Sequence, residues 1–244
     1  MAVRLALNKF VKCALEAFVN GGDFVEYNEY PHSLFIINVC EKSFVCGGSV
    51  LNQELVLTAA HCLEDCVGKQ EPKVQVRYGH KKIDRMSKTF LKKFVIHEQY
   101  DRFLVSNDIA LVRTKERIPL NDNVKRVIIM RYPLNERNAY VAGWGLDEFK
   151  KRSGLLKHTK ALIQSQQACE ENISFMPKGV FCAGPLSGIG AADRGDSGGA
   201  LVINGCIQIG IVSFRIPDKT LVAYTNVTYY WDWIHENALA LFCS

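Results

Sequence analysis

The sequence of 244 residues contains no internal repeat, no low-complexity tract and no linker that would divide it. No hydrophobic run reaches the length of about 20 residues that a transmembrane helix requires. The cysteines lack the paired C-x-x-C spacing that is typical of structural zinc sites. These absences argue against a repeat protein, a membrane-spanning protein and a cysteine-based metal centre.

The composition is that of a chain that buries a full hydrophobic core. Hydrophobic residues make up 48% of the sequence, and the formal net charge is +5. This mild positive charge comes without a nucleic-acid-binding motif, so no nucleic-acid partner is expected. The length permits two domains, but it also suits one compact all-β unit.

Short apolar or β-branched runs, separated by turn residues, predict strands along most of the chain. The expected strands are 33–39, 73–78, 108–114, 139–143, 200–203, 207–213 and 221–227. Only the end, roughly 229–240, has the spacing of a helix, with Trp233, Ile234 and Asn237 three and four residues apart. Many short strands without alternating long helices favour a sandwich or a barrel.

Three short motifs stand in an order that indicates nucleophilic catalysis. The segment RGDSGG at 194–199 presents Ser197 between glycines, and LTAAHC at 57–62 and SNDIAL at 106–111 precede it. A candidate base, His61, and an orienting acid, Asp108, therefore come before the nucleophile. A GDSGG segment alone is also ordinary turn chemistry. The spacings, 47 residues from His61 to Asp108 and 89 from Asp108 to Ser197 by subtraction, place the three on different loops.

On these motifs the chain resembles the trypsin and chymotrypsin-like serine proteases, from about Val19 to about Asn237. The resemblance implies an all-β fold of two antiparallel six-stranded barrels with a C-terminal helix and the site between the barrels. It implies a protease domain over 19–244 behind an atypical segment, 1–18. The expected protein is a secreted monomeric endopeptidase without a cofactor, which forms an acyl-enzyme with protein or peptide substrates. An activating protease and a macromolecular inhibitor are its other expected partners.

The resemblance also assigns a role to each motif residue. Ser197 attacks the peptide carbonyl, His61 takes its proton, and Asp108 orients the imidazole. The backbone N–H groups of Gly195 and Ser197 form the oxyanion hole. Ser213 donates a hydrogen bond to Asp108.

Nine cysteines indicate an oxidising compartment, because such frequent use is rare where thiols are kept reduced. The resemblance pairs Cys46 with Cys62 and Cys169 with Cys182. Cys40 and Cys66 lie on loops that are neighbours in this fold, so they are expected to form a third bridge. Cys13, Cys206 and Cys243 remain, and both a bridge from Cys206 to Cys243 and free thiols stay open.

The specificity pocket departs from the trypsin pattern. Its base falls at Ala191, where trypsin-like members carry an aspartate, so specificity for Arg or Lys is not expected. The other changed positions are Asp193 in place of a cysteine, Phe214 in place of a tryptophan, and Arg215 and Val222 in place of glycines. Three interpretations remain open: a narrowed pocket for small apolar side chains, an Arg215 that selects acidic residues, and an occluded pocket.

The activation segment departs as well. Residues 19–22 fit the segment whose new amino group, on Val19, pairs with the aspartate before the nucleophile, Asp196. Phe18 stands where an Arg or Lys is usual. The alternatives are a chymotrypsin-like activator, a wrongly drawn exon boundary before Val19, and a zymogen that is never cut. The boundary error is expected, since residues 1–18 form neither a signal peptide nor a recognisable activation peptide. An extracellular location is expected although no signal peptide is visible.

A basic segment replaces a metal site of some family members. Residues 78–93 carry lysines and arginines where those members place calcium-binding carboxylates, so no metal is expected. This segment is either a solvated face or a surface for an acidic partner or a sulfated polymer. The competing function for the whole chain is a protease-like binding or regulatory domain that is catalytically silent or locked as a zymogen. The complete set of His61, Asp108 and Ser197 favours the enzyme.

Overall fold

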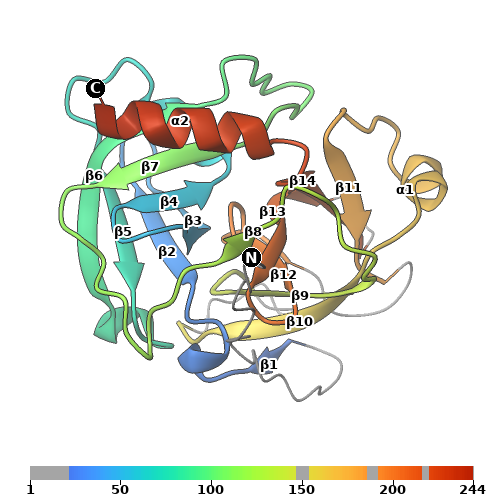
Figure 1. Ribbon diagram of the computed structural model, residues 1–244, viewed down its shortest axis with the longest axis horizontal. Coiled ribbons are helices and arrows are strands. Elements are labelled where there is room, and N and C mark those ends of the chain that lie inside the picture. The colour runs from blue at the N-terminus through green and yellow to red at the C-terminus, as the bar shows by residue number, and fades with distance from the viewer. Residues whose placement is uncertain (1–21, 147–153, 186–191, 216–219, 244) are drawn as a thin grey trace, which may run out of the picture.

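The computed structural model describes residues 22–146, 154–185, 192–215 and 220–243. The strands form two units that lie side by side, with one long helix across the top of the first (Figure 1). The first unit is a closed barrel with the strand order β2-β3-β4-β7-β6-β5. Its strands are β2 (Ser33–Asn38), β3 (Phe44–Val50), β4 (Leu55–Thr58), β5 (Val74–Tyr78), β6 (Ser87–Ile96) and β7 (Ala110–Thr114).

The second unit is an eight-stranded sheet with the order β1-β10-β9-β12-β13-β14-β11 and with β8 paired in parallel to β13. Its strands are β1 (Asp23–Phe24), β8 (Ile128–Ile129), β9 (Asn138–Gly143), β10 (Lys157–Leu162), β11 (Val180–Ala183), β12 (Ala200–Ile203), β13 (Ile207–Arg215) and β14 (Val222–Asn226). A single bridge between Ile163 and Ala183 joins the region after β10 to β11. The expected all-β class is confirmed, and the second unit closes through this one bridge rather than through a continuous ladder.

Two helices complete the described fold: α1 (Gln166–Asn172) and α2 (Trp231–Cys243). Ile234 and Leu241, seven residues apart, are the buried residues of α2 and fall on one face of the helix. The helix contacts β6 and β7, and Arg113 of β7 donates a hydrogen bond of 3.1 Å to the Leu241 carbonyl. The expected C-terminal helix is therefore present and covers the first barrel. No helix among the described residues is long and apolar enough to cross a membrane.

The expected strands lie where alternation or apolar runs indicated them, with ends shifted by at most two residues. In β5, for example, Val74, Val76 and Tyr78 are buried while Gln75 and Arg77 are half-exposed, as a period of two requires. The sequence pattern did not indicate β1, β3, β4, β6, β8, β10, β11 and α1. Strand β6 carries four exposed residues among its ten, so its pattern is only weakly apolar.

Strand β3 was missed because it contains two glycines, which are depleted in strands. The structure explains one of them by a close approach of two backbones. A Cβ on Gly47 would lie 2.9 Å from the Cα of Gly199, and the Gly47 N–H donates to the Ser197 carbonyl at 2.6 Å. Gly47 thus lets the first barrel touch the loop that carries Ser197.

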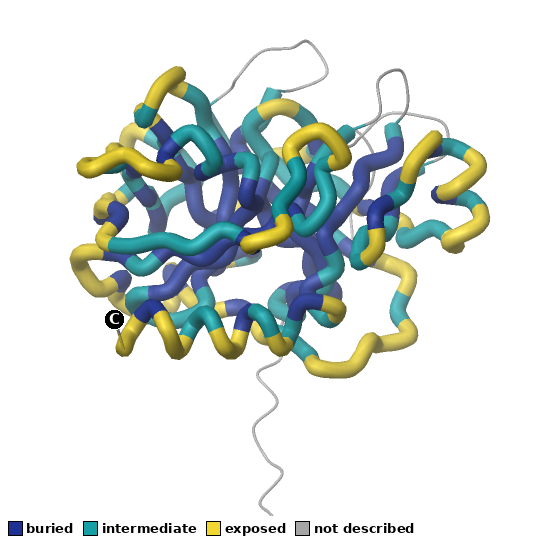
Figure 2. Tube along the Cα trace, turned by 90° about the horizontal axis from the view of Figure 1, so that it is seen from above, coloured by how far each residue is buried: buried dark blue, intermediate teal, exposed yellow. Residues whose placement is uncertain are grey.

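The two units meet along a buried seam. Ser49 of β3 donates a hydrogen bond of 2.6 Å to the Gln208 side chain of β13, and both residues are fully buried. Figure 2 shows the buried part of the trace in the middle of the molecule and the exposed part at its rim. The basic segment contributes to this seam, because the Lys81 carbonyl accepts hydrogen bonds from the Trp144 ring and from the Leu156 backbone.

Three disulfides join the pairs expected from the sequence: Cys40 with Cys66, Cys46 with Cys62, and Cys169 with Cys182. Cys206 also forms a disulfide. Cys243 is a free thiol at the exposed end of α2. The bridge between Cys206 and Cys243 that the sequence left open is therefore wrong. Cys13 lies outside the described residues.

Candidate active site

The candidate residues come from both units and meet at the seam. His61 lies in a short 3-10 helix, η2 (Ala60–Cys62), directly after β4, and Asp108 lies directly before β7. Because β4 and β7 pair side by side, with Thr58 opposite Ala110, the two residues project from neighbouring strand ends. Ser197 lies before β12 in the second unit. Its carbonyl contacts the first barrel through Gly47.

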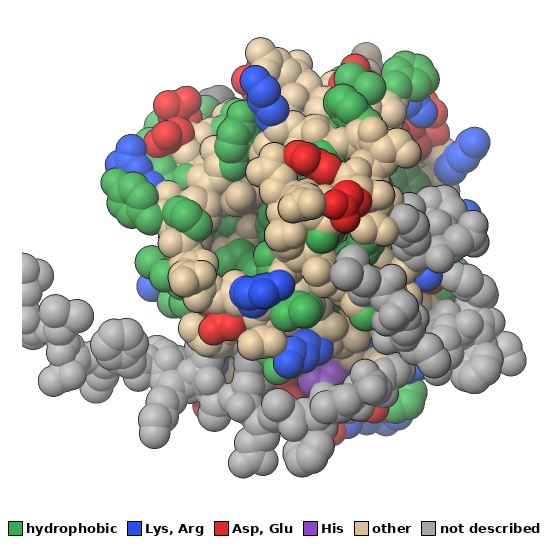
Figure 3. Space-filling view, turned by 90° about the vertical axis from the view of Figure 1, so that its right-hand side faces the viewer, with side chains coloured by type: hydrophobic (Ala, Val, Ile, Leu, Met, Phe, Trp, Pro, Cys, Tyr) green, Lys and Arg blue, Asp and Glu red, His purple; other side chains and the backbone are tan. Residues whose placement is uncertain are grey.

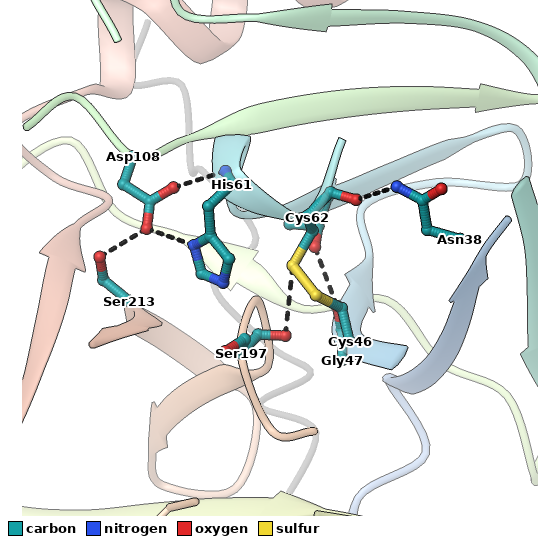
Figure 4. Close-up of a disulfide and its surroundings, with 9 residues drawn as sticks. Asn38, Cys46, Gly47, His61, Cys62, Asp108, Ser197 and Ser213 are labelled. Carbon is teal, nitrogen blue, oxygen red and sulfur yellow. Dashed lines mark hydrogen bonds and ion pairs between the residues drawn. A yellow bond between two sulfur atoms is a disulfide. The ribbon is translucent and has the colours of Figure 1, made fainter. Parts of the chain in front are cut away.

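Asp108 is fully buried, and its carboxylate accepts three hydrogen bonds (Figure 4). His61 donates twice, from ring Nδ1 to Oδ2 at 2.8 Å and from its backbone N–H to Oδ1 at 2.9 Å. The Ser213 hydroxyl donates to Oδ2 at 2.5 Å. Figure 4 shows the opposite edge of the imidazole directed toward the Ser197 segment. The arrangement fixes which ring nitrogen carries the proton, because Nδ1 must donate to the carboxylate.

The pKa values of this pair move apart. Burial opposes protonation of His61, but attraction to the Asp108 carboxylate, their hydrogen bond and the charge of Glu64 outweigh it and raise the pKa of His61. Burial alone would raise the pKa of Asp108. The charge of His61 and the hydrogen bonds from His61 and Ser213 reverse this effect and lower the pKa of Asp108. The aspartate stays ionised while the histidine becomes a better base.

Two further contacts hold the Asp108 segment in place. The Thr225 hydroxyl of β14 donates to the Asp108 carbonyl at 2.9 Å, and the Tyr230 hydroxyl donates to the Asn107 side chain at 2.8 Å. Asn107 has a φ of 53°, a left-handed conformation that asparagine tolerates better than most residues. The sequence analysis missed these contacts. They cross 117 and 123 residues of chain, so no local pattern signals them.

The loop around Ser197 is ordered by the neighbouring Asp196. Its carboxylate accepts hydrogen bonds from the backbone N–H of Gly145 at 2.7 Å and of Asp193 at 3.0 Å. A Cβ on Gly143 or on Gly145 would collide with this carboxylate. Gly195 has a φ of 102°, in the region that favours glycine. Val19, the expected partner of Asp196, lies outside the described residues.

A hollow of about 800 Å³ opens beside Ser197. Its described lining includes three of the four expected pocket residues, Phe214, Arg215 and Val222, together with Asp193. The fourth, Ala191, lies outside the described residues. Arg215 Nη1 donates to Asp193 Oδ2 at 2.5 Å, so the cation and the anion that replace family residues form an ion pair. Both residues depart from the family pattern in the sequence, but only the structure pairs them.

The same region does not offer a thiolate metal site. Ligand atoms of Cys46, His61 and Cys62 lie within 4.8 Å of one another. The two cysteines are bonded to each other, so neither sulfur is a thiolate. The chemistry that the arrangement supports is proton transfer through the His61 imidazole next to a hydroxyl.

Comparisons with known proteins identify the family. The family model described as Trypsin matches residues 19–234. The chain belongs to the trypsin family. It is 32% identical over 222 residues to trypsin V-A of Rattus norvegicus, which covers 86% of this chain and 87% of that protein. It is also similar to brachyurin of Leptuca pugilator (31% identity; 88% and 96% covered) and to chymotrypsin of Phaedon cochleariae (29%; 90% and 82%). As a member of the trypsin family, the chain is a serine endopeptidase that acts on proteins.

Proposed function

We propose that the chain is a secreted endopeptidase that cleaves peptide bonds with Ser197 as nucleophile, His61 as base and Asp108 as orienting acid. The observation that carries this proposal is the buried Asp108 carboxylate, which holds the His61 ring at 2.8 Å beside the hollow at Ser197. A hydroxyl, a base and an oriented acid next to a cleft are the parts that acyl transfer requires.

The reaction follows from this geometry. The Ser197 hydroxyl attacks the carbonyl carbon of the substrate, and its proton passes to Nε2 of His61. The imidazolium then protonates the leaving amine. The fragment on the C-terminal side of the cleaved bond leaves with this amine, and the N-terminal fragment stays bound to Ser197 as an ester. Water, deprotonated by His61, attacks this ester; the second fragment leaves as a carboxylic acid, and His61 returns the proton to the Ser197 oxygen. Asp108 stays ionised throughout and stabilises the imidazolium.

The backbone N–H groups of Gly195 and Ser197 are the proposed donors to the negative oxygen of the intermediate. The left-handed backbone at Gly195 and the two backbone hydrogen bonds to Asp196 support this assignment, because they order the turn that carries both donors. Removing one such donor typically slows a hydrolase about 100- to 1,000-fold. Ser213 supports the site by its hydrogen bond to Asp108.

The proposed specificity is for neutral side chains on the amino side of the cleaved bond. Arg215 and Asp193 neutralise each other in the lining of the hollow, so neither charge is available at low cost to a charged substrate group. Phe214 and Val222 add apolar surface to the same lining. Of the three interpretations that the sequence left open, the ion pair supports a pocket for uncharged side chains over one that selects acids.

The proposal extends to how the enzyme is activated and where it acts. A new amino group at Val19 would pair with Asp196, whose carboxylate faces the Gly143 and Gly145 backbone. The disulfides support an extracellular location. We further propose a monomer that an activating protease switches on and a macromolecular inhibitor controls. Amino-terminal sequencing of native protein, expected to begin at Val19, and its mass in solution test these points.

Labelling with a fluorophosphonate probe tests the catalytic assignment, since the probe needs an activated serine but little substrate specificity. We expect wild-type protein to be labelled and Ser197→Ala to lose both labelling and proteolysis. His61→Ala should lose activity to a similar extent, on the order of a millionfold, because the three residues act as a unit.

A serine elsewhere in the chain provides the control. Ser165→Ala removes only the N-cap hydrogen bond of α1, to the backbone N–H of Ala168, and should leave labelling intact. Equal labelling of wild type and Ser197→Ala would refute the assignment. Native protein without labelling, whether or not residues 1–18 are removed, would favour the silent, protease-like domain.

A further inference from the structure

A second hollow, of about 600 Å³, lies on the outer side of the first barrel. Its floor follows one row of paired residues across three strands: Ile37 of β2 pairs with Gln75 of β5, which pairs with Phe90 of β6. Figure 1 shows these strands next to one another in the barrel wall. Successive residues of a strand point to opposite faces, so this row faces outward while Ile36 and Val76 are fully buried.

The floor of this groove is apolar and partly uncovered. The exposed fractions are 41% for Phe90 and 45% for Val39, both of which line the groove. Ile37 is partly buried beside them and packs against the core. A recess with an apolar floor and a polar rim has the character of a binding site, and its volume falls in the range of about 300–1,000 Å³ that ligand pockets occupy.

Three lysines, all exposed, stand on the rim: Lys73, Lys92 and Lys115. Within the described part of the chain, none of them takes part in an ion pair. The only acidic residue of the described lining is Glu71, so the rim carries three positive charges against one negative charge. On the face of the second unit that Figure 3 shows, acidic and basic side chains are interspersed instead.

Backbone and side-chain hydrogen bonds hold the groove in shape. The Val39 N–H donates to the Lys73 carbonyl at 3.0 Å, and the Lys115 N–H donates to the Phe90 carbonyl at 2.8 Å. Asn38, which lies between Ile37 of β2 and Val39, donates from its side chain to the Cys62 carbonyl at 2.8 Å. This hydrogen bond links the wall of the groove to Cys62, the residue after His61. A preformed site of this kind loses little conformational entropy when it binds a partner.

We propose that this groove is a docking site for an acidic peptide segment that carries a large apolar anchor side chain. The anchor lies on Phe90, Val39 and Ile37, and the flanking carboxylates face the lysines of the rim. An acidic peptide with such an anchor uses both the charge and the apolar floor. A sulfated polysaccharide would satisfy the lysines and leave the exposed apolar surface without a partner. The groove is separate from the hollow at Ser197, so the proposal does not depend on the catalytic assignment.

Fluorescence anisotropy with a labelled nonapeptide of Asp and Glu around one central Phe tests the proposal. The full chain with Ser197→Ala serves as the receptor, which prevents cleavage of the peptide. We expect saturable binding that weakens as salt is added. The double variant Lys73→Gln/Lys115→Gln should weaken it about two- to thirty-fold, as two exposed charge pairs predict. Phe90→Ser should weaken it at least about fivefold, and Phe90→Leu should retain most of it.

Matched controls lie outside the groove. Lys88→Gln removes another exposed charge from β6, and Phe175→Ser removes another exposed aromatic ring. Neither should change the affinity by as much as the groove variants. Equal losses in groove and control variants, or equal affinity for a peptide with Ser in place of Phe, would overturn the proposal. Tighter binding of heparin that is insensitive to Phe90→Ser would overturn the assignment to a peptide.

Discussion

The ion pair between Arg215 and Asp193 predicts how the substrate preference changes when one partner is removed. Arg215→Gly takes away the cation and leaves the Asp193 carboxylate, which is only 12% exposed, in the lining of the hollow beside Ser197. A substrate Arg or Lys would then place a positive charge where the Arg215 guanidinium had been. We expect the preference to shift from neutral toward basic side chains.

The size of the shift follows from the geometry. A hydrogen bond to a charged group at 2.5 Å contributes about 1.5–3 kcal/mol, which corresponds to about a 10- to 150-fold change in a rate ratio. The Arg215 side chain is 33% exposed, so solvent screens the pair and the lower end applies. The ratio of kcat/KM for basic over neutral substrates should therefore rise about tenfold in Arg215→Gly.

Fluorogenic peptides that differ only in the residue on the amino side of the cleaved bond measure this ratio. Asp193→Asn is the matched variant, since it removes the negative charge that Arg215 Nη1 contacts and should raise the preference for acidic residues by a similar factor. Combining the two substitutions should restore a neutral preference. If Arg215→Gly slowed all substrates equally and left the ratios unchanged, the pair would serve only to position the loop, and the charge argument would be refuted.

Three further predictions concern pH and packing. Activity requires neutral His61, so kcat/KM should fall as the pH drops through the raised pKa of His61. Glu64→Gln removes one cause of the raised pKa and should move this fall in kcat/KM to lower pH. A pH profile that does not move would contradict the role of Glu64. His32 is buried with no partner for Nε2 in the described part of the chain, and desolvation lowers its pKa to about 4. A folded-state pKa below the unfolded value of about 6.5 means that stability is lost as the pH falls from about 6.5 to about 4, by up to about 3 kcal/mol. Urea unfolding at pH 7 and pH 4.5 should show a smaller loss in His32→Phe; an equal loss would place the acid sensitivity elsewhere. Gly143→Ala would drive a Cβ into the Asp196 carboxylate and should lower fluorophosphonate labelling at least tenfold, whereas Gly68→Ala, at an exposed position where an added Cβ meets no atom, should leave labelling unchanged.

Local sequence was enough to indicate the fold class and the members of the candidate site. The strands β2, β5, β7 and β12 bury alternate or successive apolar residues. This pattern involves only neighbouring residues, so it can be recognised in the sequence. Ser197 stands among glycines because the turn around it needs left-handed φ values at Gly195 and Gly198.

Only the tertiary structure decided which of these residues touch and what lies between them. Arg215 and Asp193 are 22 residues apart, and no local sequence pattern indicates that they form an ion pair. The row of Ile37, Gln75 and Phe90 exists only in the observed register, since a slip of one residue would turn those side chains to the other face. Gly143 and Gly145 look like ordinary turn glycines until the Asp196 carboxylate is seen to occupy the space of their missing Cβ atoms. Backbone conformation is set by near neighbours, whereas ion pairs, surface rows and close approaches depend on segments that meet only after the chain has folded.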